Sequence, residues 1–226
     1  MVSISWRSNG GLVLSEYERW ESRFGVSEFI FGKEPSYFLV SCRSLLPRSG
    51  TALAVADGEG RNGIWLAEQG LEVVSTDFSP SAQEKAKALA KQRGVEIIFE
   101  LADVHTWKYP EVAFDVVVEI FTQFSSPVER ERKWAGMRKT LKPGGLLIIQ
   151  GYTPKQLQYG TGGPKQIENL YTRDMLEKAF GNFRDVNIVE EEVDIQEGTS
   201  HGGMSAVINF TGRRPYETRK SSTATV

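Results

Sequence analysis

The sequence has few of the residues that build disulfides, metal clusters or membrane helices. Its one cysteine, Cys42, cannot form a disulfide within the chain, which is typical of a reducing compartment. Cys42, His105 and His201 are too few to build a metal cluster of the Cys/His type. No apolar stretch approaches the roughly 20 residues that a membrane helix needs, and the first residues lack the pattern of a signal peptide. We therefore expect a soluble, cytoplasmic protein with no bound metal and no membrane partner.

An excess of charge is also missing. The net charge is −2 and the isoelectric point is about 5.9, so bulk electrostatics predict no nucleic-acid partner. The chain has 226 residues, of which 40% are hydrophobic and 25% are charged. These values suit a single globular domain whose core needs no disulfide or metal. We expect a monomer or a homodimer.

Strand and helix patterns alternate along the chain. Residues 51–56 are apolar throughout, as in a buried parallel strand, and a short helix over 61–69 follows. Ser79 and Pro80 begin a second helix, and Ser126 opens a third with the spacing of a capping box. Further strands are expected over 71–76, 95–101, 114–120 and 145–150. The last two, 184–193 and 204–211, follow a helix over 172–180 and have no helix between them, which predicts an antiparallel pair.

This order of elements predicts an α/β fold with a doubly wound, mostly parallel sheet and an antiparallel edge. Within it we expect an N-terminal helical segment over residues 1–40, a main domain over 41–214 and a disordered tail over 215–226. Aromatic residues follow the first helix, namely Phe31, Tyr37 and Phe38. They either cover a bound ligand or pack that helix onto the sheet.

A glycine-rich turn follows the first strand. In the stretch TALAVADGEGRNG, Gly58, Gly60 and Gly63 match the G-x-G-x-x-G pattern of dinucleotide-binding proteins. Such turns also occur wherever the backbone must approach another kind of ligand. The pattern alone therefore leaves the ligand open.

Acidic residues lie at the carboxyl ends of the first four strands, at the edge where a doubly wound sheet binds its ligand. They are Asp57, Asp77, Asp103 and Glu119. This arrangement favours a ligand rich in hydroxyl and amino groups over a pyrophosphate. Asp77 is placed to bind the two hydroxyls of a ribose, and Asp103 to accept a hydrogen bond from an adenine amino group. An NAD-dependent oxidoreductase stays open as an alternative, although the chain leaves little room for a separate substrate domain.

Five successive motifs resemble those of class I S-adenosylmethionine-dependent methyltransferases over about residues 18–212. They are ALAVADGEGRNGIWLAEQG, VVSTDFSP, LADV, FDVVVEIF and LKPGGLLII. Two flanking segments, RWESRFGVSEFIFGKEPSYFL and QLQYGTGGPKQIENLYT, resemble the small-molecule branch related to tellurite-resistance and thiopurine methyltransferases. The resemblance implies a seven-stranded sheet whose last strand is antiparallel. It also implies S-adenosyl-L-methionine as cofactor, S-adenosyl-L-homocysteine as product and a small-molecule methyl acceptor.

The resemblance also implies positions for the cofactor. Gly58 and Gly60 would pass under its methionine part, Asp77 would bind the ribose, and Asp103 and Val104 would flank the adenine. The full set of residues expected at the cofactor is Phe31, Ala56, Asp57, Gly58, Gly60, Asn62, Asp77, Phe78, Ala102, Asp103, Val104, Glu119 and Ile120.

The chain departs from the family pattern in its first strand. The family usually has an acid at the position of Ala54, near the methionine amino group, and a glycine at the position of Ala56. Here the acid appears three residues later, as Asp57. In a strand an odd offset points to the opposite face, although a turn can redirect the side chain. A catalytically silent relative that binds S-adenosyl ligands and serves a partner protein therefore stays open.

Methyl transfer from a sulfonium is an in-line displacement that needs the acceptor held close to the methyl group. A thiolate or a chalcogen anion needs no general base, whereas a hydroxyl does. The candidate catalytic residues are Glu119, His201 and Tyr152; His201 is either a proton acceptor or an exposed turn residue. Because no base stands out, we expect a soft or easily ionised small acceptor. A protein substrate is a further alternative.

Overall fold

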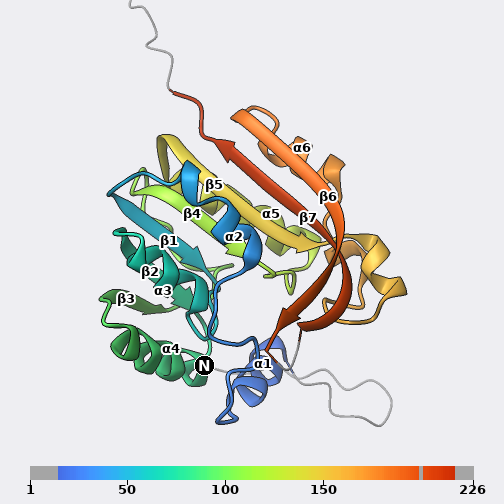
Figure 1. Cartoon of the computed structure of the whole chain (residues 1–226). Helices are drawn as coiled ribbons and strands as arrows, with labels where there is room; N and C mark the ends of the chain where they lie inside the picture. Colours follow the sequence, from blue (N-terminus) through green and yellow to red (C-terminus); the bar gives the residue numbers. More distant parts are fainter. Residues whose placement is uncertain (1–14, 199–200, 217–226) are drawn as a thin grey trace, which may run out of the picture.

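The computed structural model describes residues 15–198 and 201–216. Within them a seven-stranded sheet has the order β3-β2-β1-β4-β5-β7-β6 and carries helices on both faces (Figure 1). The strands are β1 (Thr51–Val55), β2 (Glu72–Asp77), β3 (Ile97–Leu101), β4 (Phe114–Ile120), β5 (Leu141–Tyr152), β6 (Arg184–Glu197) and β7 (His201–Arg213). The α-helices are α1 (Glu16–Phe24), α2 (Tyr37–Ser41), α3 (Arg61–Glu68), α4 (Pro80–Arg93), α5 (Pro127–Thr140) and α6 (Arg173–Phe180).

The predicted fold class is confirmed. β1 pairs in parallel with β2 and β4, β2 with β3, and β4 with β5. β7 is antiparallel to both of its neighbours, β5 and β6. The reversal occurs because β6 runs into β7 through a hairpin, without the helix that a parallel crossover requires.

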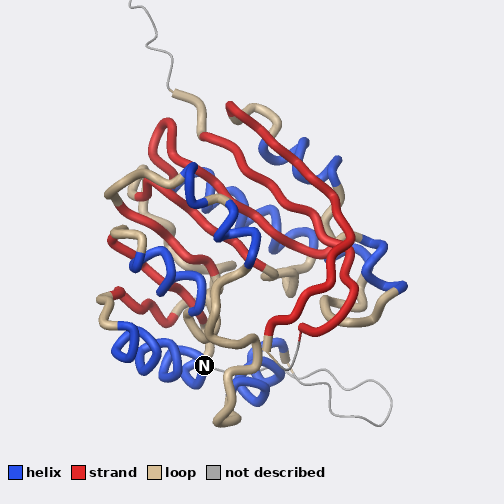
Figure 2. Tube along the Cα trace, in the orientation of Figure 1, coloured by secondary structure: helices blue, strands red, loops and turns tan. Residues whose placement is uncertain are grey.

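The alternation of side chains along the central strands produces two cores, one on each face of the sheet. Leu53 and Val117 pack on one face with Trp134 of α5 and Phe180 of α6. On the other face, Val116 packs with residues of α2 and α3. The tube view shows these helices in front of and behind the same continuous sheet (Figure 2). Burial on both faces explains why these strands are apolar throughout.

The expected helix starts are present. The Ser79 side chain accepts a hydrogen bond from the Ala82 amide at 3.1 Å, one turn into α4. At the start of α5, Ser126 and Glu129 form the expected capping box. Each cap places a helix directly after a loop that lies at the ligand-binding edge of the sheet.

The last two strands are longer than predicted, and the added length of β7 contains His201, a candidate catalytic residue. Their pairing continues as far as Glu197 and His201, well beyond the predicted ends at 193 and 204. The hairpin end of β6 and β7 approaches the segment that contains α1 (Figure 1). There the ring of His201 lies 4.5 Å from that of Phe31, centroid to centroid. His201 therefore lies in a strand and not in an exposed turn.

The N-terminal segment lies across the carboxyl end of the sheet. The Glu21 carboxylate of α1 accepts hydrogen bonds from the hydroxyls of Ser79 and Ser81, at the start of α4. Residues 1–14 of the predicted N-terminal segment and residues 217–226 of the predicted tail lie outside the described residues. In the described part of the chain, no helix has both the length and the apolar character needed to cross a membrane.

Candidate functional site

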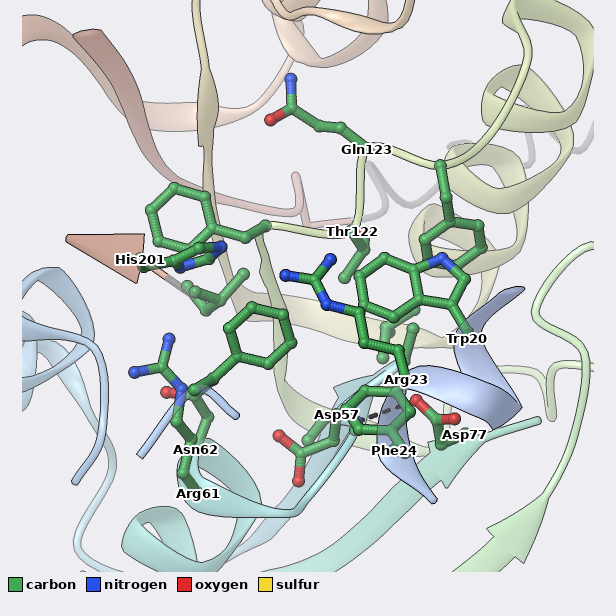
Figure 3. Close-up of a pocket in the computed structure, with 18 of the residues that line it drawn as sticks. Trp20, Arg23, Phe24, Asp57, Arg61, Asn62, Asp77, Thr122, Gln123 and His201 are labelled. Carbon is green, nitrogen blue, oxygen red and sulfur yellow. Dashed lines mark hydrogen bonds between the residues drawn. The ribbon is translucent and has the colours of Figure 1, made fainter. Parts of the chain in front are cut away.

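A single cavity joins most of the predicted site residues at the carboxyl ends of β1, β2, β4 and β5 (Figure 3). Its walls combine aromatic rings, two carboxylates, three guanidinium groups and one imidazole. The aromatic residues are Trp20, Phe24, Phe31, Phe78, Phe121, Phe124 and Tyr152, and the charged or titratable residues are Arg19, Arg23, Asp57, Arg61, Asp77 and His201. Of the remaining predicted residues, Ala56, Gly58, Asn62 and Ile120 also line it.

The glycine turn redirects Asp57. Ala56 has a φ of 49°, which is the left-handed conformation that residues other than glycine seldom adopt. The chain therefore reverses sharply after β1. The Asp57 carboxylate accepts hydrogen bonds from the Gly63 amide at 3.1 Å and from the Ser75 hydroxyl at 3.0 Å. Asp57 thus caps the first turn of α3 and remains exposed to the cavity.

The two glycines of the turn meet other parts of the protein closely. A side chain at Gly60 would place its Cβ 2.7 Å from the Cβ of Ala86 on α4. One at Gly58 would lie 3.2 Å from the ring of Phe24 on α1. Gly60 does not line the cavity, so its absent side chain serves the packing of α4 against the turn. Gly58 lines the cavity as predicted.

Asp77 ends β2 and connects it to the turn. One of its carboxylate oxygens accepts a hydrogen bond from the Gly58 amide at 2.8 Å, and the other from the Ser79 amide at 2.9 Å. Burial raises the pKa of Asp77 to about 6 and that of Asp57 to about 7. Both carboxyl groups would be stabilised as anions by a ligand that donates hydrogen bonds or carries positive charge.

The variable residues of the glycine motif hold the N-terminal segment. The Glu59 carboxylate accepts hydrogen bonds from the Ile30 amide at 3.2 Å and the Phe31 amide at 3.3 Å. The Asn62 side chain accepts one from the Ser36 amide at 3.0 Å. These contacts fix residues 30–36 over the turn, and the Phe31 ring consequently lines the cavity.

His201 lies among aromatic rings at the far side of the cavity. Its Nδ1 is 3.5 Å from Glu197 Oε2, which also accepts a hydrogen bond from Arg61 at 2.6 Å. Its ring lies 5.1 Å from that of Phe121 and 5.7 Å from that of Tyr152. Burial lowers the pKa of His201 below its ordinary value, so the imidazole is neutral near pH 7. Neutral imidazole can accept a proton.

Glu119 does not belong to the cavity, which corrects its predicted roles in cofactor binding and catalysis. It is fully buried, and one carboxylate oxygen lies 2.6 Å from Lys133 Nζ. The same oxygen accepts hydrogen bonds from Thr122 and Tyr171, and the other accepts one from Trp134 at 2.8 Å. Burial raises its pKa, but Lys133 and these donors hold the pKa of Glu119 below its ordinary value. Glu119 is therefore the buried counter-ion of Lys133, and both of its carboxylate oxygens are bound to protein donors instead of a ligand.

The residues after β3 also lie outside the cavity lining. Val104 is buried in the core next to α5, and Ala102 is absent from the cavity walls. The Asp103 carboxylate accepts a hydrogen bond from the His105 amide at 2.9 Å and lies 3.0 Å from its Nδ1. Their predicted contact with an adenine therefore remains a prediction.

Sequence reasoning did not identify the part of the site that α1 contributes. Trp20, Arg23 and Phe24 line the cavity, and the Arg23 guanidinium lies 5.0 Å from the Trp20 ring and 5.1 Å from the Phe31 ring. No acid within the described residues lies at ion-pair distance from Arg23. The available signal was the spacing of these three residues, i, i+3 and i+4, which places them on one face of a helix.

Gln123 joins the loop after β4 to the end of β5. Its side-chain amide donates a hydrogen bond to the Tyr152 carbonyl at 2.9 Å and accepts one from the Tyr152 amide. The Gln123 side chain therefore forms the two hydrogen bonds that the backbone of a neighbouring strand would form with Tyr152. This contact sets the position of Tyr152, whose buried hydroxyl has no hydrogen-bond partner in the described part of the chain.

Comparison with known proteins agrees with this geometry. Residues 52–145 match a family described as a methyltransferase domain. This match covers the glycine turn and the strands β1 to β4. It is 26% identical over 131 residues to a 2-heptyl-1-hydroxyquinolin-4(1H)-one methyltransferase of Mycobacteroides abscessus, covering 57% of this chain and 58% of that protein. It is 33% identical over 104 residues to a demethylmenaquinone methyltransferase of Deinococcus radiodurans, covering 45% and 43%. The chain thus spans about half the length of the curated relatives it matches.

Solved structures share the fold of this chain. A structure described under the conversion of a disulfide bond into a thioacetal group during echinomycin biosynthesis has a TM-score of 0.72 at 20% identity, covering 89% of this chain and 90% of that one. The N-methyltransferase NodS of Bradyrhizobium japonicum, in complex with S-adenosylhomocysteine, has a TM-score of 0.63 at 16% identity, covering 88% and 98%. TehB of Haemophilus influenzae has a TM-score of 0.65 at 14% identity, covering 88% and 66%. At these identities the likenesses show the fold, and they do not single out the tellurite-resistance branch.

The sequence predicts S-adenosylmethionine as cofactor, and the NodS structure that shares this fold contains S-adenosylhomocysteine. The donor set of the cavity fits this ligand. Carboxylates such as those of Asp57 and Asp77 suit ammonium or hydroxyl groups, the Arg23 guanidinium suits a carboxylate, and the Phe78 ring suits an adenine. The matched proteins do not support the alternative of an NAD-dependent oxidoreductase.

Proposed function

We propose that this protein transfers the methyl group of S-adenosylmethionine to a small acceptor that binds in the same cavity. The observation that carries the proposal is the continuity of one cavity from Asp77, after β2, to Tyr152 and His201, which belong to β5 and β7. Asp77 suits the ribose and the glycine turn suits the methionine part. The aromatic end around His201 is then left for the acceptor.

The cofactor supplies an already activated methyl group, so the protein must hold the acceptor in line with it and exclude water. Phe31 and Trp20 of the N-terminal segment cover one side of the cavity, and Phe121 covers another. Arg23, whose guanidinium lies beside the Trp20 and Phe31 rings, is placed for the carboxylate of the methionine part. These residues support a site in which aromatic rings cover the reacting groups and charged groups bind the ends of the cofactor.

We propose a soft or easily ionised acceptor, such as a thiol, a chalcogen anion or an acidic hydroxyl. The apolar aromatic walls favour an acceptor that reacts as a weakly hydrated anion. His201, neutral and in contact with the Glu197 carboxylate, is the candidate that removes a proton when the acceptor arrives protonated. The relative named for a hydroxyquinolinone gives this class of acceptor additional support.

The first test is thermal unfolding with S-adenosylmethionine, S-adenosylhomocysteine and NAD in parallel. Binding at 100 times the dissociation constant stabilises a protein by about 2.7 kcal/mol, which corresponds to several degrees for a domain of this size. We expect a shift with both S-adenosyl ligands and none with NAD. A shift with NAD alone would reject the proposal.

The second test is turnover. Production of S-adenosylhomocysteine is measured with a panel of thiols, selenols, N-hydroxyquinolones and phenols. Turnover with at least one acceptor supports an enzyme. Binding of the cofactor without turnover on any acceptor would instead support the catalytically silent relative.

A further inference from the structure

A buried hydroxyl in the cavity wall lacks a hydrogen-bond partner. Tyr152 is 2% exposed, and its hydroxyl forms no hydrogen bond within the described residues. The residue also lines the cavity. Buried polar groups in folded proteins almost always have a partner, and leaving one unpaired destabilises the fold. An unpaired hydroxyl in the wall of a binding cavity is therefore available to a ligand.

The surroundings of Tyr152 fix the position of this hydroxyl. The Gln123 side chain binds both the amide and the carbonyl of Tyr152, and the Phe121 ring lies 4.6 Å from the Tyr152 ring, centroid to centroid. A Cβ at Gly162 would lie 2.8 Å from the hydroxyl, and one at Gly163 would lie 2.8 Å from the ring. Rotation of the ring about its own axis does not move the hydroxyl oxygen, which lies on that axis. The hydroxyl therefore cannot turn toward another protein group.

The Tyr152 hydroxyl is a donor at neutral pH. Burial raises the pKa of Tyr152, and the Glu197 carboxylate raises this pKa further. The phenol therefore keeps its proton and is not the base that deprotonates an acceptor. A neutral hydroxyl in a site shielded from water can donate to a lone pair on oxygen or nitrogen.

Tyr152 lies at the acceptor end of the cavity. It belongs to β5 and pairs with Val207 of β7, whereas Asp77 ends β2 on the other side of β1. Its ring lies 5.7 Å from that of His201, which Figure 3 shows across the cavity from Asp77. His201 is the candidate that takes a proton from the nucleophilic atom. The Tyr152 hydroxyl is therefore placed for a different atom of the same small molecule.

We propose that Tyr152 selects the acceptor, because its hydroxyl donates a hydrogen bond to a second oxygen or nitrogen close to the atom that receives the methyl group. The acceptor class is then an aromatic hydroxyl or thiol compound with a neighbouring heteroatom lone pair. The rings of Phe31 and Phe121, 4.5 Å and 5.1 Å from that of His201, suit a flat ring system. The inference rests on the proposed function, since it narrows the acceptor of the same reaction.

The experiment compares two probes that differ at one ring atom. 8-Hydroxyquinoline carries a ring nitrogen beside its hydroxyl, and 1-naphthol has a C–H group at that position. Dissociation constants of both are measured by calorimetry at pH 7, with EDTA present and the protein saturated with S-adenosylhomocysteine. The proteins are the wild type, Tyr152→Phe and Tyr159→Phe. Tyr159, whose hydroxyl is bonded to Glu192 and which does not line the cavity, is the matched control.

We expect the wild type and Tyr159→Phe to bind 8-hydroxyquinoline about tenfold more tightly than 1-naphthol, the scale of one hydrogen bond between neutral groups. This preference should vanish in Tyr152→Phe, whose affinity for 1-naphthol should equal that of the wild type. Because the hydroxyl has no partner in the described protein, ligand-free Tyr152→Phe should unfold at the same temperature as the wild type or at a higher one.

Equal binding of the two probes by the wild type would overturn the inference. So would the absence of binding of both probes, or an equal loss of affinity for both in Tyr152→Phe. A lower unfolding temperature of this variant with an unchanged preference would assign the hydroxyl a structural role and would overturn it as well. Failure of the wild type to bind S-adenosylhomocysteine would instead reject the proposed function, which is a distinct result.

Discussion

Two carboxyl groups, Asp57 and Asp77, line the cavity. Both have a pKa above that of an ordinary aspartate because burial disfavours their ionised form. Backbone amides and the Ser75 hydroxyl offset only part of that cost. The ligand-free protein therefore carries two carboxyl groups whose ionisation opposes folding.

We expect the unfolding temperature of Asp57→Asn, relative to the wild type, to rise with pH. The pKa of Asp57 is about 3.9 in an unfolded chain and about 7 in the folded protein. A raised pKa contributes stability below pH 4 that is lost as pH rises toward 7. Thermal unfolding of both proteins between pH 5 and 8 measures this.

Other titratable groups face the site as well. Their contributions cancel in the difference between the two unfolding temperatures when their pKa values are the same in both proteins. His201 acts in the opposite direction, since its lowered pKa adds stability that is lost as pH falls. Arg61 and Asp77 both interact with Asp57, and neither changes in the variant. A relative unfolding temperature that is constant across this range would contradict a raised pKa for Asp57.

His201→Gln tests the role of the imidazole. We expect a rate loss of about 10²–10⁴-fold for an acceptor hydroxyl that is protonated at the assay pH, because the glutamine cannot take the proton. The rate with a thiol assayed above its own pKa should be nearly unchanged. Single-turnover rates with both acceptors provide the measurement. Equal losses with both would indicate that His201 shapes the cavity instead of accepting a proton.

At the scale of elements, the loop after β4 is held by a buried ion pair. Glu119, in β4, and Lys133, in α5, are both fully buried and 2.6 Å apart. Lys133 also donates hydrogen bonds to the carbonyl and hydroxyl oxygens of Thr122 at 2.9 Å. Because Thr122 lines the cavity, this pair positions the wall of the site from behind.

Glu119→Gln should therefore destabilise the fold. Leaving Lys133 without its counter-ion in a buried site costs about 3–5 kcal/mol, which lowers the unfolding temperature by roughly 6–20 °C. At low temperature the folded variant should still bind S-adenosylhomocysteine. Thermal unfolding and calorimetry separate the two effects. A variant of full stability that lacks transfer activity would restore Glu119 as a catalytic residue.

The N-terminal segment depends on Glu59 in the same way. Its buried carboxylate joins the Ile30 and Phe31 amides to Lys85 of α4. Glu59→Gln should increase amide hydrogen exchange over residues 28–36 and weaken S-adenosylhomocysteine, because Phe31 would be held less firmly over the cavity. Exchange should change little over β4 and β5. Uniform loss of protection across the sheet would instead show general destabilisation.

At the scale of the whole molecule, one edge of the sheet collects contributions from distant parts of the chain. α1 and the following loop supply Trp20 and Phe31, the glycine turn supplies Asp57, and the final hairpin supplies His201. The sheet order places these segments together even though they are nearly 200 residues apart in sequence. The cavity therefore depends on the complete fold rather than on the glycine motif alone.

The sequence by itself determined the elements and their order. Local spacing and the polarity of single residues predict the apolar strands and the capped helices. They also predict that no helix separates the last two strands. The same holds for Asp77, because the acid ends a strand whose neighbour carries the glycine turn. Local patterns are sufficient where the relevant contacts lie close in the chain.

Only the tertiary structure decided the direction and the partners of the side chains. Glu119 ends up against Lys133, Tyr171 and Trp134 instead of facing the cavity, because α5 packs a lysine behind β4. Asp57 returns over β1 because Ala56 adopts a left-handed conformation that no composition rule predicts. These outcomes depend on contacts between residues that are distant in the sequence. Local sequence patterns do not show such contacts.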